Sequence, residues 1–198
     1  FYANGVLKRD FGGSNQYWVW QVRHYVNSTK DIEFAREIIP YVDSVIAKTT
    51  EELDRNGNML FSWGLQIGNQ EDFIGHPGDA ATPTIEIINM YRTRAELAEM
   101  IGEKDDADLW NEKADYTIQQ LYDVLWLNDL GRFAYFKDLA GNIRLEGQYE
   151  TYLYPLIWDI GDTRDQYTGL RHLLDRLTRN DGVVFCSNNF SWHSIGTW

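Results

Sequence analysis

The chain is poor in cysteine, proline and basic residues, and each shortage excludes something. Cys186 is the only cysteine among 198 residues, so an internal disulfide is excluded and a thiolate metal site is disfavoured. Lys and Arg number 18 against 30 Asp and Glu, which gives a net charge of −12. Because phosphate binding needs clustered basic side chains, the sequence argues against a nucleic-acid partner. No apolar run is long enough to span a bilayer, so we expect no membrane partner.

Several families of catalytic motif are also missing. The sequence has no Gly-x-Ser-x-Gly elbow, no glycine loop for phosphates and no zinc-binding helix motif. His76, His193 and Asp79 could be imagined as metal ligands, but their spacing matches no metal motif. Asp105, Asp106 and Asp108 have an ordinary explanation as acids at a helix start. We therefore expect neither a metal nor a cofactor.

Apolar residues recur at helical spacing in six stretches. Candidate caps mark their starts: Ser28 for the second, Thr82 before Pro83 for the third, and a Thr163–Gln166 capping box for the sixth. Gly102 is the expected end of the third. The predicted helices are 14–26, 28–53, 82–101, 105–125, 149–160 and 163–177.

The connections between these helices alternate in length. Short turns at 27–31, 102–106 and 161–165 sit within each pair, and long stretches at 56–82, 127–147 and 182–198 follow each pair. Antiparallel helices joined in this way place the short turns at one end and the long loops at the other. The sequence thus predicts a single all-α domain of three helical hairpins, with a small β-hairpin at 131–143.

The long loops carry aromatic rings that a helix face cannot account for. Flat apolar rings with a polar edge suit the C–H faces of sugars. The rings in question are Phe61, Trp63, Phe73, Trp192 and Trp198.

Segments spread over most of the chain resemble the six-hairpin glycosidases, the (α/α)6-barrel superfamily with amylo-α-1,6-glucosidase-like and trehalase-like members. They are Tyr17-Trp18-Val19-Trp20, the turn from Asp54 to Leu60, Gly68-Asn69-Gln70-Glu71-Asp72-Phe73, Pro83-x-x-Glu86, Leu125-Trp126 with Gly131-Arg132-Phe133, and His193-Ser194-Ile195-Gly196-Thr197-Trp198. The resemblance implies a glycoside hydrolase acting on O-glycosidic bonds of an oligo- or polysaccharide. Such barrels have six hairpins, so the chain is expected to be a fragment of one toroid. The remaining hairpins would come from a longer chain or a second copy.

The resemblance also implies where the chemistry lies. Glycoside hydrolysis needs a carboxylic acid to protonate the leaving oxygen and a second carboxylate. Asp72 is the candidate general acid because Phe73 follows it and Glu71 can raise its pKa by like-charge repulsion. Glu71 is the alternative acid. The structural alternative is an acidic loop that caps backbone N–H groups. The second carboxylate of such enzymes usually lies beyond the equivalent of Trp198.

Other residues are candidates for binding the sugar. Asp79 is expected to cap the third helix, in preference to binding substrate. Glu86 is expected in the first turn of that helix, where the dipole favours an anion, and the resemblance lets it face the cleft. The candidate substrate-binding residues are Trp63, Gln66, Asn69, Gln70, Phe73, Glu86, His193 and Trp198.

Two other functions fit the same pattern. One is a carbohydrate epimerase or lyase, which would rely on His or Tyr for proton abstraction. The other is a non-catalytic helical array that binds a glycan or a protein. Fold alone does not separate them.

Overall fold

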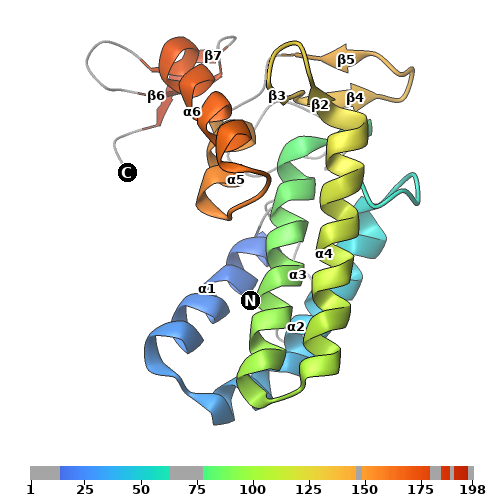
Figure 1. The fold of residues 1–198 in the computed structure, drawn as a ribbon, viewed down its shortest axis with the longest axis vertical. Coiled ribbons are helices and arrows are strands. Elements are labelled where there is room, and N and C mark those ends of the chain that lie inside the picture. Colours follow the sequence, from blue (N-terminus) through green and yellow to red (C-terminus); the bar gives the residue numbers. More distant parts are fainter. Residues whose placement is uncertain (1–13, 63–77, 146–148, 179–183, 188–189, 196–198) are drawn as a thin grey trace.

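A computed structural model describes residues 14–62, 78–145 and 149–178, together with the backbone of two strands at 184–187 and 190–195. These residues form six helices in three antiparallel hairpins (Figure 1). The hairpins are α1 (Ser14–Thr29) with α2 (Ile32–Leu53), α3 (Ala81–Ile101) with α4 (Lys104–Leu125), and α5 (Tyr149–Ile157) with α6 (Thr163–Leu177). The all-α prediction is confirmed.

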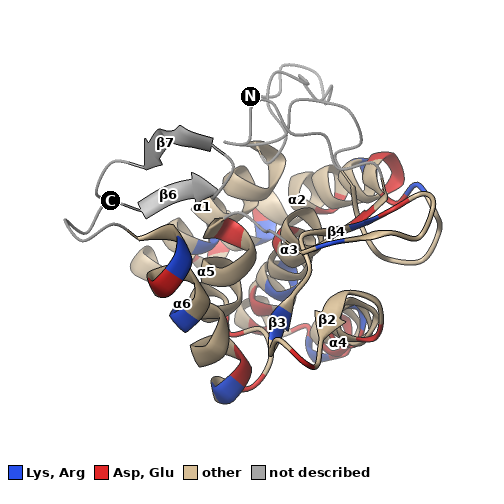
Figure 2. Ribbon diagram, turned by 90° about the horizontal axis from the view of Figure 1, so that it is seen from above, with Lys and Arg blue, Asp and Glu red and all other residues tan. Residues whose placement is uncertain are grey.

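The helices form two layers. Helices α1, α3 and α5 run in the same direction side by side, and α2, α4 and α6 pack outside them (Figures 1 and 2). Seen down the helices, α3 lies at the centre, in contact with α1, α2, α4 and α5. This position explains why α3 is buried on every face from Ala81 to Tyr91.

Short strands gather at the end where the long connections lie. Strand β1 (Gly78–Ala80) pairs with β4 (Phe136–Asp138), which pairs with β5 (Ile143–Arg144), and β2 (Trp126–Leu127) pairs with β3 (Arg132–Phe133). The last strands, β6 (Val184–Ser187) and β7 (Phe190–Ile195), pair with each other. The predicted hairpin at 131–143 is confirmed, and the partnership with β1 is an addition. We call this end the rim and the opposite one the short-turn end (Figure 1).

The core lies between the two layers. Val19, Val22 and Val26 of α1 face Val42, Val45 and Ile46 of α2, and the isoleucines of α3 complete the cluster. Phe61 belongs to this core and is fully buried, so its assignment to a sugar-binding loop is wrong. No helix within the described part of the chain is both long and apolar enough to cross a membrane.

Three of the predicted helix caps are wrong because other groups satisfy the first N–H donors. Asp31, not Ser28, caps α2 by accepting from the Phe34 N–H, and Asp162, not Thr163, caps α6 by accepting from the Asp165 N–H. Gln166 instead donates to Asp159 and to the Gly161 carbonyl. At α3 the Tyr135 carbonyl accepts the Ala81 N–H, so Thr82 is not needed as a cap.

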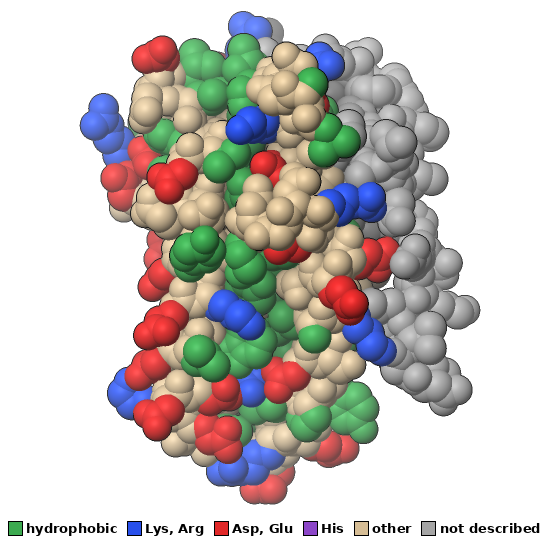
Figure 3. Space-filling model, turned by 90° about the vertical axis from the view of Figure 1, so that its right-hand side faces the viewer, with side chains coloured by type: hydrophobic (Ala, Val, Ile, Leu, Met, Phe, Trp, Pro, Cys, Tyr) green, Lys and Arg blue, Asp and Glu red, His purple; other side chains and the backbone are tan. Residues whose placement is uncertain are grey.

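Not every apolar residue of the outer helices is buried. In α6 the buried face is Gln166, Gly169, Leu173 and Leu177, whereas Tyr167 and Leu174 are exposed. In α2 Tyr41 is exposed and Ala35 and Ile39 are buried. The hydrophobic strip between charged side chains in Figure 3 shows that the outer layer keeps apolar groups at its surface. Gly102 ends α3 as predicted, with a φ of 89°.

Candidate functional site

The rim is formed by the first turns of three parallel helices. Because α1, α3 and α5 run in the same direction, their N-termini lie at the same end of the molecule (Figure 1). The N-terminus of a helix carries partial positive charge and unsatisfied N–H groups. Three such termini at one end favour carboxylates there.

Two glutamates occupy this region without solvent exposure. Glu86 lies in the second turn of α3 and Glu150 in the first turn of α5, and both are 0% exposed. Thr82 and Thr151 join the same two helices through hydroxyl groups 3.1 Å apart. Burying a carboxylate is costly, so two such groups at adjoining helix starts are unusual for a purely structural core.

The charges of both glutamates affect the pKa of Tyr154. Burial raises the pKa of its phenol far above the usual value, and Glu150 and then Glu86 raise it further. Both carboxylates therefore act electrostatically on one phenol, which stays protonated. The Tyr154 hydroxyl lies 2.6 Å from the Tyr17 hydroxyl, so α1 is tied to the same group.

Asp79 is a third buried carboxylate at the rim, and it does not cap α3 as predicted. The amides of Asn56 and Asn58 donate to its two oxygens at 2.7 and 3.1 Å. Asp54 holds the turn that carries both asparagines by accepting from the backbone of Asn58 and Met59. Asp79 is thus fixed as an acceptor between the end of α2 and the start of α3.

Arg132 is the buried cation of the rim. It donates to the Leu145 carbonyl at 2.6 Å and to the Tyr152 hydroxyl at 2.8 Å, and its guanidinium lies over the Tyr152 ring. These contacts fasten the β3 strand to α5, the helix that carries Glu150. Arg132 therefore supports the position of the α5 start.

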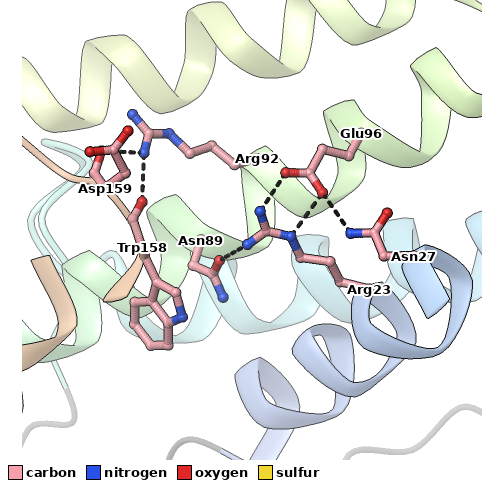
Figure 4. A network of polar contacts seen from close by, with 7 residues as sticks. All are labelled: Arg23, Asn27, Asn89, Arg92, Glu96, Trp158 and Asp159. Atoms are coloured by element: carbon pink, nitrogen blue, oxygen red, sulfur yellow. Dashed lines mark hydrogen bonds and ion pairs between the residues drawn. The ribbon is translucent and has the colours of Figure 1, made fainter. Parts of the chain in front are cut away.

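A second polar network lies further from the rim, between the inner helices (Figure 4). Arg23 of α1 forms a two-pronged contact with Glu96 of α3, at 2.8 and 2.6 Å, and also donates to Asn89. Arg92 donates to the carbonyls of Trp158 and Asp159 at the end of α5. These arginines fix both neighbours of α3 to it, and Arg92 satisfies carbonyls that a helix end leaves open.

The described residues include only part of the predicted site. Asp72 and Glu71 lie outside them, as do Trp63, Gln66, Asn69, Gln70, Phe73 and Trp198. His193 belongs to strand β7, of which only the backbone is described. The segment 63–77 joins the described chain at Ser62 and Gly78, and the Phe61 carbonyl accepts the Ala80 N–H, so both attachment points are at the rim.

Glu86 is the one candidate substrate-binding residue whose side chain is described, and it lies in the second turn of α3 instead of the first. Glu150, Tyr154 and Tyr17 were not predicted as site residues. Glu150 could have been found, because it is the single charged residue in the apolar and aromatic stretch from Tyr149 to Trp158. Within the described ranges, no three His, Cys, Asp or Glu side chains are grouped to hold a metal ion.

Comparison with known proteins finds similarity in the fold. No protein-family model matches the chain, and no curated protein matches its sequence. A GH78 family rhamnosidase of Bacillus sp. GL1 is similar in structure, with a TM-score of 0.65 and 17% identity over 80% of this chain. A rhamnosidase from Klebsiella oxytoca, solved with rhamnose bound, has a TM-score of 0.61 and 15% identity over 90% of this chain.

These likenesses define the fold class. The chain shares its fold with a helical part of these two rhamnosidases. It spans 17% and 33% of the length of the two rhamnosidases.

Proposed function

We propose that the chain is the part of a glycoside hydrolase that carries one side of the sugar-binding cleft. The observation that supports this most is the meeting of Glu86, Glu150 and Tyr154 at the rim. Hydrolysis of a glycosidic bond needs one carboxylic acid that stays protonated and one carboxylate. Carboxyl groups in a buried, like-charged setting differ in proton affinity, which is the property that separates the two roles.

The proposed general acid remains Asp72, with Glu71 as the alternative. Their segment begins and ends at the rim, which supports a role beside Glu86 and Glu150. In this proposal Glu86 and Glu150 orient hydroxyl groups of the sugar and set the electrostatic field. Trp63, Gln66, Asn69, Gln70, Phe73, His193 and Trp198 remain proposed sugar contacts.

The substrate to try first is an aryl rhamnoside, because both similar structures are named rhamnosidases. We expect release of the aryl group, and a loss of 10²- to 10⁴-fold in kcat for Asp72→Asn if it is the general acid. Glu86→Gln and Glu150→Gln should reduce kcat/KM by at least about tenfold each, which is the effect of about 1.4 kcal/mol. Glu99→Gln, at an exposed position of the same helix as Glu86, is the matched control.

The outcomes separate this proposal from its rivals. A folded protein that releases nothing from a panel of aryl glycosides contradicts hydrolysis. Sugar binding without turnover, unaffected by Asp72→Asn, indicates a non-catalytic glycan-binding array. Activity on an epimerase or lyase substrate that depends on His193 or Tyr154 indicates the other enzyme class.

We further propose that the third hairpin packs against more helices to complete the toroid. Its exposed apolar side chains support this: Leu156, Ile157, Tyr167 and Leu174. The partner is either further hairpins of a longer chain or a second copy. Analytical ultracentrifugation distinguishes them, since a second copy predicts a dimer that Leu156→Asp with Ile157→Asp dissociates. A monomer whose state those substitutions do not change contradicts the second-copy version.

A further inference from the structure

The turn that follows α2 contains an asparagine followed by a glycine, Asn56 and Gly57. Both residues are exposed, and the turn projects from the side of the molecule (Figure 1). Gly57 has a φ of +66°, and a Cβ added to it would have nothing within 4 Å. The Gly57 N–H makes no hydrogen bond within the described residues. Its nitrogen therefore has no side chain beside it and no hydrogen bond to give up.

An asparagine amide next to such a nitrogen can cyclise. The deprotonated Gly57 nitrogen attacks Cγ of Asn56, a C–N bond forms, and the side-chain nitrogen takes a proton from water and leaves as ammonia. Water then hydrolyses the five-membered imide at either carbonyl, which gives aspartate or isoaspartate. No electrons are transferred, and water is the only co-reactant. We propose that Asn56 is a site of spontaneous deamidation and that this modification loosens the attachment of Asp79 at the rim.

The contact that would change is the one between Asn56 and Asp79. The Asn56 amide donates to Asp79 Oδ1 at 2.7 Å, and Asp79 is only 8% exposed. Deamidation replaces this donor with a second carboxylate, so a hydrogen bond is lost and two like charges face each other. Asp54 adds a third carboxylate to the same turn. After the modification, the amide of Asn58 would be the remaining donor to Asp79 from this turn.

Other asparagines of the described chain lack these conditions. Asn58 uses both ends of its amide, since it donates to Asp79 and accepts from the Leu60 N–H. Asn142 is followed by the β-branched Ile143, and its amide donates to an aspartate. Asparagines inside the helices precede N–H groups that are hydrogen-bonded within the helix. The conditions therefore single out Asn56 in this part of the chain.

Asp79 opposes the reaction that would release it. The Asn56 amide must leave the Asp79 carboxylate before its Cγ can meet the Gly57 nitrogen. We therefore expect the folded chain to deamidate more slowly than a free peptide of residues 50–62. Asp79→Ala should accelerate deamidation of the folded chain, because it removes the acceptor that holds the amide.

Peptide mapping by mass spectrometry, after prolonged incubation of the whole chain in mildly alkaline buffer, tests the modification. We expect Asn56 to react at least about tenfold faster than Asn128, which is exposed in a turn but precedes an aspartate, because a side chain on the next residue hinders attack by its nitrogen. Gly57→Ala should slow the reaction for the same reason. Asn56→Gln should slow it because a glutamine must form a larger ring. A conversion of Asn56 no faster than that of Asn128 overturns the proposal.

Thermal unfolding of Asn56→Asp tests the consequence. Its unfolding temperature should fall below that of the wild-type chain, whereas Asn128→Asp, which adds the same charge at an exposed turn residue, should leave it unchanged. Equal shifts in the two variants overturn the assigned link to Asp79.

The double variant Asn56→Asp with Asp79→Asn reverses donor and acceptor. It should recover most of the lost unfolding temperature, because the amide and the carboxylate again face each other. Where Asn56→Asp does not fold, this double variant decides: a folded double variant supports the link, and an unfolded one overturns it. These experiments measure mass or stability, so their outcomes hold whether or not the chain hydrolyses a glycoside.

Discussion

The two ends of the helical array differ in how their buried charges are balanced. Toward the short-turn end, the buried Arg94 of α3 lies between two acids, with its Nη2 2.6 Å from Asp106 of α4 and its Nε bonded to Asp43 of α2. Burial opposes the charge of Arg94, but the two carboxylates outweigh burial and raise its pKa. Among the described residues of the rim, three buried carboxylates, Asp79, Glu86 and Glu150, accompany one buried arginine, Arg132.

The difference agrees with the proposed function, in which the short-turn end serves stability and the rim carries the chemistry. Arg94 connects three helices in a balanced arrangement, and Arg36 adds a hydrogen bond to the Ile101 carbonyl at the end of α3. An excess of buried acids stabilises a fold poorly, since each desolvated charge is costly. Such an excess of buried acids is typical of functional sites, where costly charged groups are retained because the function needs them.

Arg94→Leu should have the largest effect on stability. It removes the charge between Asp43 and Asp106 and the contact with the Trp110 ring, so we expect the free energy of unfolding to fall by about 3 kcal/mol. Urea titration measures this change. Arg171→Leu is the control, because Arg171 and Asp175 form an exposed pair whose loss should cost less than about 1 kcal/mol. Equal effects of the two substitutions would contradict the assigned role of Arg94.

Gly78→Ala should weaken the rim through its backbone. Gly78 has a φ of +134°, and an added Cβ would meet the Lys137 carbonyl of the paired strand β4. We expect a loss of about 2 kcal/mol in unfolding free energy. Gly141→Ala isolates the conformational part, because Gly141 also has a positive φ but nothing within 4 Å of its added Cβ. A smaller loss at Gly78 than at Gly141 would show that the close approach of β1 to β4 is unimportant.

Alkaline pH should destabilise the protein, and Tyr154→Phe should reduce that dependence. Burial raises the pKa of the phenols of Tyr91, Tyr122 and Tyr154. A raised pKa in the folded state gives stability that is complete below the unfolded value of about 10 and is lost as the pH rises above it. Each phenol contributes a slope of up to about 1.4 kcal/mol per pH unit.

Urea unfolding at pH 8, 10 and 11 measures this slope. Tyr154→Phe should reduce it by the share of one phenol, and the exposed Tyr41→Phe should leave it unchanged. An unchanged slope in Tyr154→Phe would mean that Tyr154 ionises as easily in the folded state as in the unfolded state.

Glu86→Gln should have the smallest effect on stability, although Glu86 is fully buried. Removing one of several neighbouring acids relieves repulsion while keeping the shape of the side chain, so we expect a change of less than about 1 kcal/mol. The same substitution should impair sugar turnover, as proposed above. A loss of several kcal/mol would instead make Glu86 a structural residue like Arg94.

Much of the architecture could be predicted from the sequence. Alternating short and long connections predicted the three hairpins and the two ends, and Gly102 predicted the end of α3. The helix starts were less predictable, because Ser28, Thr82 and Thr163 are plausible caps locally. A neighbouring acid or a carbonyl from a distant hairpin satisfied those N–H groups instead.

The candidate site was only partly predictable. Glu86 was selected through a resemblance, while Glu150, Tyr17 and Tyr154 looked like ordinary helix residues. Their significance depends on being brought together from α3, α5 and α1, which no local pattern encodes. The role of Asp79 also depended on Asn56 and Asn58, which lie more than twenty residues earlier in the chain.

By itself, the sequence determined the helical periodicity, the pairing of helices into hairpins and the acidic character of the chain, because these depend on the spacing and type of nearby residues. Tertiary structure alone decided which helix became central, which carboxylates were buried together and which aromatic rings meet between α1 and the end of α5. Those features depend on distances between residues remote in sequence, and such distances are fixed only when the layers pack.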